Sequence, residues 1–235
     1  MNIIIPMGGK GQRFIDAGYT VPKPFIDVLG TPMYQLAINN LANNAFDQFV
    51  FIVSKDHKDY LCDILTFCPR SKIVIIDQPV SGSVPACLLA EDYVPPFAPL
   101  VIANCDQIID WNSYDFYTLC NASSVDGIVP TFKAVSNAHS YARQENGIVV
   151  EIKEKQVISD DALCGVHFWR TADMAFRSFR KSLAGPPHFN GDYYIAPTYN
   201  ELIKEGKKII TYHTNGMTIL GTPEKLEEYI LGDLL

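Results

Sequence analysis

Residues 2–14 read NIIIPMGGKGQRF, an apolar run followed directly by three glycines within four positions. The consecutive isoleucines predict a short strand that is buried on both faces, as in a parallel sheet. Gly8, Gly9 and Gly11 let the backbone approach an anion closely, and successive N–H groups in such a loop can point at phosphate oxygens. The pattern is neither GxxxxGK[ST] nor GxGxxG, which disfavours a Walker loop and a dinucleotide fingerprint. We therefore expect a strand followed by a different anion-binding loop, with a plain glycine-rich turn as the alternative.

The rest of the first half continues this alternation of apolar runs and segments with helical period. Strands are expected at residues 2–6, 48–53, 72–76 and 100–103, and helices at 33–43, 56–67 and 84–93. Strands that are apolar on both faces and alternate with helices predict a doubly wound, mostly parallel α/β sheet of Rossmann-like type. Ligands of such sheets bind beyond the carboxyl ends of the strands.

From about Asp126 the sequence becomes rich in β-type segments, at residues 127–132, 147–155 and 162–169, with Asn146-Gly147 as a turn signal. Helices are expected at 174–183, 196–205 and 223–231, and a further strand at 208–212. No linker or repeat separates the halves. We expect one domain of two lobes, 1–125 and 126–235.

The composition favours a folded protein with a substantial core and an acidic surface. Hydrophobic residues make up 48% of the 235 residues, and 19 Lys and Arg against 26 Asp and Glu give a net charge of −7. Such a surface repels nucleic acid and anionic membranes, so any phosphate must be captured locally. No apolar run approaches the roughly 20 residues of a membrane span, and the six cysteines are scattered. We expect a soluble, reduced, cytoplasmic protein with neither nucleic acid nor membrane as partner.

Two basic residues and one carboxylate follow the expected strands. Arg13 lies just inside the glycine loop, and Lys23 is held between two prolines in Val21-Pro22-Lys23-Pro24. A stiffly held lysine beside such a loop suits a polyphosphate, although an exposed lysine in a proline-rich loop is the plainer interpretation. Asp106 follows the strand at 100–103 and suits a Mg²⁺ ion bound to a nucleotide. Its alternative role is to cap the next turn or helix.

The stretches IIPMGGKGQRF (4–14) and VPKPFIDVLGTPM (21–33) resemble the GGxGxR and PKP signature of the sugar-phosphate nucleotidylyltransferases, also called nucleotide-sugar pyrophosphorylases. The resemblance extends to later landmarks as far as Tyr229. It implies a nucleotide-binding α/β lobe at 1–125, a smaller β-rich acceptor lobe with a C-terminal helix at 126–235, and Mg²⁺ as cofactor. It also implies attack by a sugar 1-phosphate on the α-phosphorus of an NTP, with release of pyrophosphate.

The resemblance assigns a role to each candidate site residue. Catalysis falls to Arg13 and Lys23 on the polyphosphate and to Asp106 as the metal ligand. The nucleotide is expected to contact the glycine loop and a base-reading loop: Gly8, Gly9, Gly11, Gln78 and Gly82. The acceptor is expected to contact Asn104, Glu154, Lys155, Gly165 and Asp192. One departure is Ile219, which stands where many relatives carry a second aspartate.

The expected reaction needs no protein base, because the attacking phosphate is already an anion at neutral pH. The alternatives are a cytidylyltransferase acting on a choline, alcohol or amino-acid phosphate, and a non-catalytic nucleotide-sugar sensor or regulatory subunit, which Ile219 leaves open. A glycosyltransferase would use a D-x-D motif, but residue 104 is Asn. The family also suggests a homo-oligomer and a role in polysaccharide biosynthesis.

Overall fold

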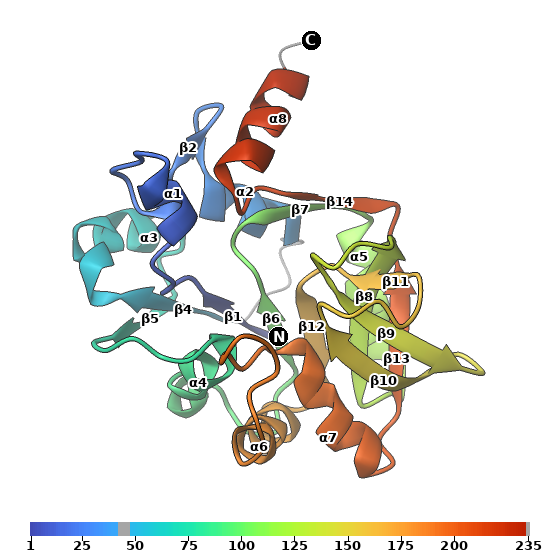
Figure 1. The fold of residues 1–235 in the computed structure, drawn as a ribbon. Helices are drawn as coiled ribbons and strands as arrows, with labels where there is room; N and C mark the ends of the chain where they lie inside the picture. The colour runs from blue at the N-terminus through green and yellow to red at the C-terminus, as the bar shows by residue number, and fades with distance from the viewer. Residues whose placement is uncertain (42–47, 234–235) are drawn as a thin grey trace.

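A computed structural model describes residues 1–41 and 48–233 of the chain (Figure 1). Four parallel strands form the N-terminal half of its main sheet in the order β5-β4-β1-β6. Their bounds are Asn2–Pro6 for β1, Gln48–Ser54 for β4, Lys72–Ile76 for β5 and Leu100–Ala103 for β6. The register pairs Ile3 with Phe49 on one side and with Val101 on the other. These strands confirm the predicted parallel core.

Helices cover both faces of this core because neighbouring residues of a strand point to opposite sides. Ile3 and Ile5 lie in one apolar cluster, whereas Ile4 lies in another. The face of Ile3 and Ile5 is covered by α2 (Met33–Leu41), α3 (Leu61–Phe67) and α5 (Ser113–Ala122). The face of Ile4 is covered by α4 (Ser83–Leu88) and α6 (Ala172–Leu183). The sheet is therefore doubly wound, as the sequence predicts.

The strand order creates a switch point between β1 and β6. After β1 the chain builds outward through β4 and β5, and it then returns to place β6 on the free side of β1. Where the loops after two neighbouring parallel strands run in opposite directions, a crevice opens at the carboxyl ends of those strands. The loop after β1 holds the three glycines, and the loop after β6 holds Asp106. The fold thus brings these two segments to the same edge of the sheet.

The second half extends the same sheet with antiparallel strands, so that ten strands of the described residues form one sheet. Next to β6 come β12 (Val166–Trp169), β8 (Gly127–Lys133), β11 (Asp161–Leu163), β9 (Ser140–Glu145) and β10 (Ile148–Glu154). Strand β13 (Ile209–His213) pairs in parallel with β8. Asn146 and Gly147 both have positive φ, 51° and 76°, and connect β9 to β10 as predicted.

Several predicted helices are shorter or begin as 3-10 helix. Residues 56–67 split into η2 (Lys55–Tyr60) and α3, because η2 buries only His57 and lacks an apolar stripe. Residues 84–93 split into α4 and η3 (Glu91–Tyr93), and residues 196–205 into η4 (Ala196–Thr198) and α7 (Tyr199–Lys204). The predicted end of the helix at 33–43 lies outside the described residues.

Short elements that the sequence did not predict complete the region around Asp106. They are α1 (Gln12–Asp16), η1 (Lys23–Phe25), β2 (Asp27–Val28), β3 (Thr31–Pro32), β7 (Gln107–Asp110) and β14 (Gly216–Ile219). β7 pairs antiparallel with β14. The final helix α8 (Pro223–Asp233) buries Leu226 in a cluster with Phe14 of α1 and Leu220. This packing holds the segment after β14 beside the N-terminal loops.

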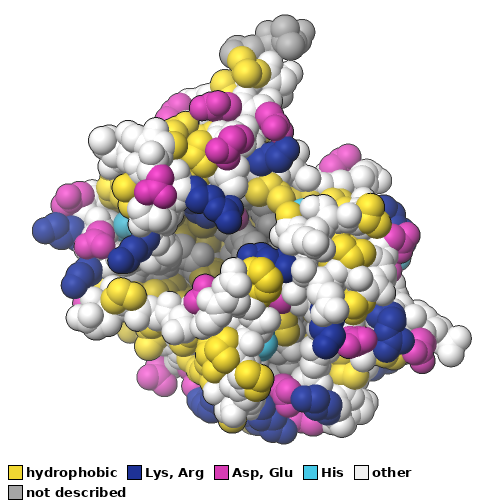
Figure 2. All heavy atoms as spheres, in the orientation of Figure 1, with side chains coloured by type: hydrophobic (Ala, Val, Ile, Leu, Met, Phe, Trp, Pro, Cys, Tyr) yellow, Lys and Arg dark blue, Asp and Glu magenta, His cyan; other side chains and the backbone are white. Residues whose placement is uncertain are grey.

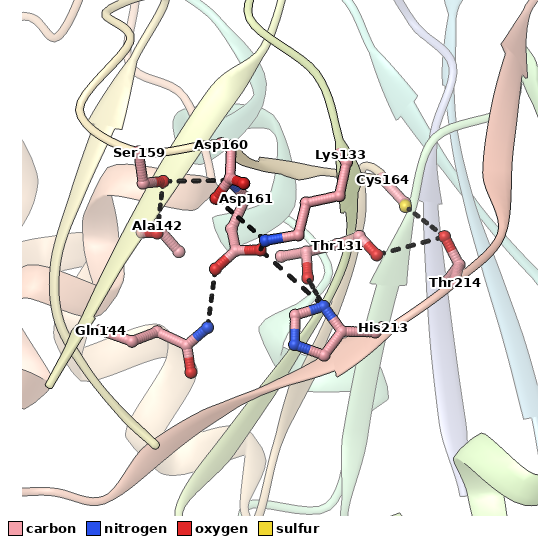
Figure 3. Close-up of polar contacts among 10 residues, drawn as sticks. All are labelled: Thr131, Lys133, Ala142, Gln144, Ser159, Asp160, Asp161, Cys164, His213 and Thr214. Atoms are coloured by element: carbon pink, nitrogen blue, oxygen red, sulfur yellow. Dashed lines mark hydrogen bonds and ion pairs between the residues drawn. The ribbon is translucent and has the colours of Figure 1, made fainter. Parts of the chain in front are cut away.

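A polar cluster joins four strands of the second half (Figure 3). Asp161 of β11 is buried and accepts hydrogen bonds from Lys133 of β8 at 2.8 Å and from Gln144 of β9 at 2.7 Å. His213 of β13 points toward the same carboxylate, with 3.8 Å between Nδ1 and Oδ1. Because each strand contributes a partner to one buried carboxylate, the cluster stabilises this end of the sheet.

All six cysteines are free thiols. Within residues 1–41 and 48–233, each helix is too short or too polar to cross a bilayer.

Candidate active site

The three glycines of the loop after β1 have different surroundings. A Cβ on Gly8 would lie 2.7 Å from Ile76 Cδ1, so this glycine permits tight packing against β5. Gly11 has a φ of +64°, caps the N-terminus of α1, and would place a Cβ 2.9 Å from Lys23 Cβ. A Cβ on Gly9 would meet nothing within 4 Å, and Gly9 lines a cavity. Gly8 and Gly11 are therefore required by the packing and backbone conformation of the loop, while Gly9 exposes its backbone to the cavity.

Lys23 and Asp106 form an ion pair across the crevice. Lys23 Nζ lies 2.6 Å from Asp106 Oδ2, and the two side chains are 23% and 20% exposed. Burial alone lowers the pKa of the Lys23 ammonium, but the facing Asp106 carboxylate overrides this and holds that pKa above its ordinary value. The pair thus joins η1 to the loop after β6 through two residues that are 83 positions apart in the chain.

Two cavities open at this edge of the sheet, and Arg13 lines neither of them. Its side chain belongs to α1 and is exposed. Its positive charge still acts on the site, because it opposes protonation of Lys23. Lys10, within the glycine loop, lines the larger cavity instead. Only its position between Gly9 and Gly11 could have singled it out from the sequence.

A larger cavity of about 810 Å³ opens beside the glycine loop. Gly8, Gly9, Gln78 and Gly82, four of the five residues expected at the nucleotide, line it together with Lys23, whereas Gly11 does not. Asp192, expected at the acceptor, lines this cavity as well. Its charged lining consists of three lysines and three aspartates: Lys10, Lys23, Lys55, Asp56, Asp77 and Asp192. Figure 2 shows this face of the molecule hollowed, with Lys and Arg side chains around the hollow. The charges of this lining cancel, so the cavity is locally neutral in a chain of net charge −7, and its lysines are the groups available to a phosphate.

Two distant loops close the side of the larger cavity. Gly82 has a φ of +96°, and a Cβ there would lie 2.5 Å from the Tyr193 carbonyl oxygen. Tyr193 N–H donates to the Ser81 carbonyl at 2.9 Å, and Val84 N–H donates to the Tyr193 carbonyl at 3.1 Å. This pairing brings Asp192 and Tyr194 to the cavity. Asp192 thus lies with Gln78 and Gly82 in the larger cavity, and outside the lining of the smaller one.

A smaller cavity of about 240 Å³ shares Ser83 and Tyr194 with the larger one. Four of the predicted acceptor residues, Asn104, Glu154, Lys155 and Gly165, line it together with Asp106. Asp106 therefore reaches the smaller cavity, and its partner Lys23 lines the larger one. The ion pair sits where the two cavities meet.

The charged residues of the smaller cavity are held by specific contacts. Glu154 accepts a hydrogen bond from the Ser140 hydroxyl. Burial raises the pKa of the Glu154 carboxyl, and the contacts with Ser140 and Lys155 partly oppose that rise. The Lys155 ammonium lies 4.6 Å from the centre of the Phe189 ring and 5.1 Å from that of the Tyr194 ring. Lys155 therefore presents a fixed positive charge at the cavity wall.

Gly165 lacks a side chain, and two amide side chains pack against its backbone. It has a φ of +65°, and a Cβ there would lie 2.4 Å from Asn104 Nδ2 and 2.6 Å from Gln107 Oε1. Its carbonyl accepts the Asn104 N–H at 3.0 Å. The space over the Gly165 Cα is thus filled by the amides of Asn104 and Gln107.

Asp106 is the one carboxylate expected at the metal ion. Residues 1–41 and 48–233 contain no group of three or more His, Cys, Asp or Glu side chains that could hold a metal ion. Ile219 lies beside Asp106, since both side chains flank the Cα of Gly221. Mg²⁺ is commonly bound through one or two carboxylates with substrate phosphates and water as the other ligands. Asp106, at a crevice beside a cavity with three lysines, fits such a nucleotide-bound ion.

Comparison with known proteins gives consistent matches. The sequence model of the nucleotidyl transferase family matches residues 2–192. The bifunctional protein GlmU of Methanococcus aeolicus is 25% identical over 211 residues, covering 87% of this chain and 47% of the relative. The chain spans about half the length of the curated relatives that it matches.

Two solved structures share the fold over almost the full chain. The nucleoside-diphosphate-sugar pyrophosphorylase of Vibrio cholerae RC9 is 24% identical with a TM-score of 0.87, covering 97% of this chain and 99% of the other. A UDP-glucose pyrophosphorylase complexed with UDP-glucose is 18% identical with a TM-score of 0.81, covering 99% and 98%.

Proposed function

This chain belongs to the nucleotidyl transferase family, and we propose that it condenses an NTP with a sugar 1-phosphate to give a nucleotide sugar and pyrophosphate. The observation that carries the proposal is the Lys23–Asp106 ion pair at the junction of two adjoining cavities. One cavity is large enough for a nucleotide and the other suits a small phosphorylated acceptor. The names of the similar pyrophosphorylases support a sugar phosphate as that acceptor.

The larger cavity holds the triphosphate and the base in this proposal. Backbone N–H groups of the Gly8–Gly11 loop and the ammonium groups of Lys10 and Lys23 bind the phosphates, and Arg13 adds positive potential from outside the lining. Gln78 and the backbone at Gly82 read the base edge, with Asp192 beside them. The lysines offset the charge that grows on the leaving pyrophosphate.

The smaller cavity holds the acceptor. Lys155 attracts the acceptor phosphate, while Glu154 and the Asn104 amide bind its polar groups. Because that phosphate is already anionic, the chain supplies alignment and charge neutralisation, and no general base is needed. The adjoining cavities align the acceptor oxygen with the α-phosphorus.

Asp106 would hold Mg²⁺ in this site, with the remaining ligands coming from phosphate and water. The ion would neutralise phosphate charge and make the phosphorus a better electrophile. Lys23, hydrogen-bonded to Asp106 Oδ2, keeps the carboxylate oriented toward the junction of the cavities.

The test is a matrix of ATP, CTP, GTP, UTP and dTTP against phosphorylated acceptors, scored by pyrophosphate release. We expect Mg²⁺-dependent release with at least one NTP and one sugar 1-phosphate. Release only with choline or amino-acid phosphates would contradict the sugar assignment. Nucleotide binding without release for any acceptor would contradict the enzymatic proposal and favour a sensor.

A further inference from the structure

One loop supplies residues to the linings of both cavities. Residues 184–195, the wall segment, connect α6 to η4 and pass the start of α4 (Figure 1). Asp192 lines the larger cavity, and Tyr194 lines both. Asn190 and Gly191, with φ of 48° and 84°, form the tip of a tight hairpin within the segment. The placement of Asp192 and Tyr194 therefore depends on what holds this segment against the rest of the protein.

His188 ties the wall segment to α6. Tyr194 N–H donates to His188 Nδ1 at 2.8 Å, and 2.7 Å separates His188 Nε2 from the Ser182 hydroxyl oxygen on α6. A backbone N–H is a donor only, so Nδ1 is the unprotonated nitrogen and Nε2 carries the hydrogen. Both nitrogens of the neutral imidazole are thereby used, one on the wall segment and one on α6.

The other contacts of the wall segment act on neighbouring groups. Tyr193 pairs with the loop before α4 through its own N–H and carbonyl. The Lys155 ammonium acts on the Tyr194 side chain, 5.1 Å from the centre of its ring. The partner of the Tyr194 N–H is His188 Nδ1. Loss of this acceptor would leave a half-buried amide without a hydrogen bond, which is costly.

The surroundings of the His188 ring favour its neutral form. Burial lowers the pKa of the imidazole, and the negative charge of Glu201 on α7 partly opposes this. On α6 the ring faces the uncharged Ser182 hydroxyl, and within the wall segment it packs edge-to-face against Tyr193, with centroids 5.6 Å apart. Protonation of Nδ1 would turn the acceptor into a donor that faces another donor, the Tyr194 N–H.

We propose that His188 is a positioning residue for the nucleotide, because as a neutral acceptor it fixes the backbone that carries Asp192 and Tyr194. This inference rests on the proposed function, since it takes the larger cavity as the nucleotide site. His188 lines neither cavity, so it acts through the wall segment and not on the ligand. Its loss should weaken nucleotide binding while the Lys23–Asp106 pair stays in place.

The first test measures nucleotide binding in variants of His188. His188→Leu removes the acceptor, whereas the amide oxygen of His188→Asn keeps one near the position of Nδ1. His213→Asn is the matched control, because His213 lies on β13 and outside both cavity linings. Calorimetry uses whichever of ATP, CTP, GTP, UTP and dTTP binds the wild type most tightly, with Mg²⁺ and without acceptor.

His188→Leu should raise Kd for the nucleotide about 10-fold, because the Tyr194 N–H loses its acceptor. His188→Asn and His213→Asn should stay close to the wild type. Thermal denaturation checks that each variant is folded. Equal Kd values for wild type and His188→Leu would overturn the inference and leave the proposed function intact. Equal losses in His188→Leu and His188→Asn would also overturn it, since the acceptor would then make no difference.

Steady-state kinetics distinguish positioning from a direct part in the reaction. In His188→Leu, KM for the NTP should rise about 10-fold, while kcat at saturating NTP changes much less. A large loss of kcat with unchanged KM would contradict a role in positioning the nucleotide.

Acidification gives a readout that loss of packing alone would not move. Nitrogen-15 NMR of the ligand-free wild type measures the pKa of the His188 ring and identifies which nitrogen carries the hydrogen. Below that pKa, the nucleotide affinity of the wild type should fall toward that of His188→Leu, while His188→Asn shows no such fall. Proteins are compared at equal pH, because nucleotide phosphates titrate in the same range. A constant ratio of the wild-type and His188→Asn affinities throughout the titration, or a hydrogen on Nδ1 at neutral pH, would refute the proposal.

These binding measurements separate the inference from the enzymatic proposal. A wild type that binds a nucleotide more tightly than His188→Leu supports the inference even if no pyrophosphate is released. A wild type that binds none of the five nucleotides would contradict both.

Discussion

Replacing His167 by Phe tests whether the neutral imidazole of a buried histidine lines the smaller cavity. Burial lowers the pKa of His167 to about 3, against an ordinary value of 6.5. The unfolded chain therefore binds a proton at this residue as the pH falls below 6.5, while the folded chain does not. More protons bound in the unfolded state mean that stability rises with pH, so the wild type loses stability on acidification.

The size of the loss follows from the two pKa values. At pH 5 the pH lies about 1.5 units below the pKa of the histidine in the unfolded chain and about 2 units above its pKa in the folded chain. Protonation of the unfolded chain then lowers the free energy of unfolding by about 2 kcal/mol. At pH 7 the cost is only about 0.2 kcal/mol. His167→Phe removes this contribution. The stability difference between wild type and variant should therefore shift by about 2 kcal/mol, in favour of the variant, from pH 7 to pH 5.

Urea denaturation at both pH values measures this shift. Tyr199→Phe is the control, because Tyr199 packs 5.9 Å from the imidazole but its phenol does not titrate in this range. Its stability difference from wild type should be the same at pH 5 and pH 7. If the His167→Phe difference also stays constant, the imidazole is not held neutral and the argument from burial is refuted.

Three further predictions concern glycines of the site. Gly11→Ala should lower the free energy of unfolding by about 1–3 kcal/mol and reduce turnover, because its φ is +64° and its Cβ would press on Lys23. Gly9→Ala should leave the free energy of unfolding unchanged but raise KM for the NTP, because its Cβ would meet no protein atom yet would enter the larger cavity. Denaturation and steady-state assays measure the two effects, and equal losses of stability in Gly9→Ala and Gly11→Ala would contradict this. Gly221→Ala should lower kcat in a folded protein, because the new Cβ would lie 2.5 Å from Asp106 Oδ2; unchanged kcat would contradict the placement of that carboxylate.

Much of the parallel core was predictable because its signal is local. Ile3, Ile4 and Ile5 are consecutive apolar residues, and the two faces of β1 proved equally buried. The glycine loop, Lys23 and Asp106 were predictable as candidates because each follows a strand or lies between prolines. Their meeting at one crevice follows from the strand order, which places β1 beside β6.

The missed features depend on contacts between distant segments. β7 and β14 pair across more than a hundred residues, and neither is long enough to give a clear period. His167 and Gln107 resemble ordinary strand residues in sequence, and only the fold brings both into the lining of the smaller cavity. The sequence analysis chose Arg13 and not Lys10 as the basic residue of the loop, because sequence alone does not say which of the two side chains lines the cavity.

The central claim is that Lys23 and Asp106 act together at the junction of the two cavities. The most direct measurement is kcat for pyrophosphate release by Asp106→Asn and Lys23→Gln, with Lys225→Gln on exposed α8 as the control. Each of the first two variants should stay folded by circular dichroism and lose about 10²-fold to 10³-fold in kcat, while the control is unaffected. Near-normal kcat in folded Asp106→Asn and Lys23→Gln would contradict the account.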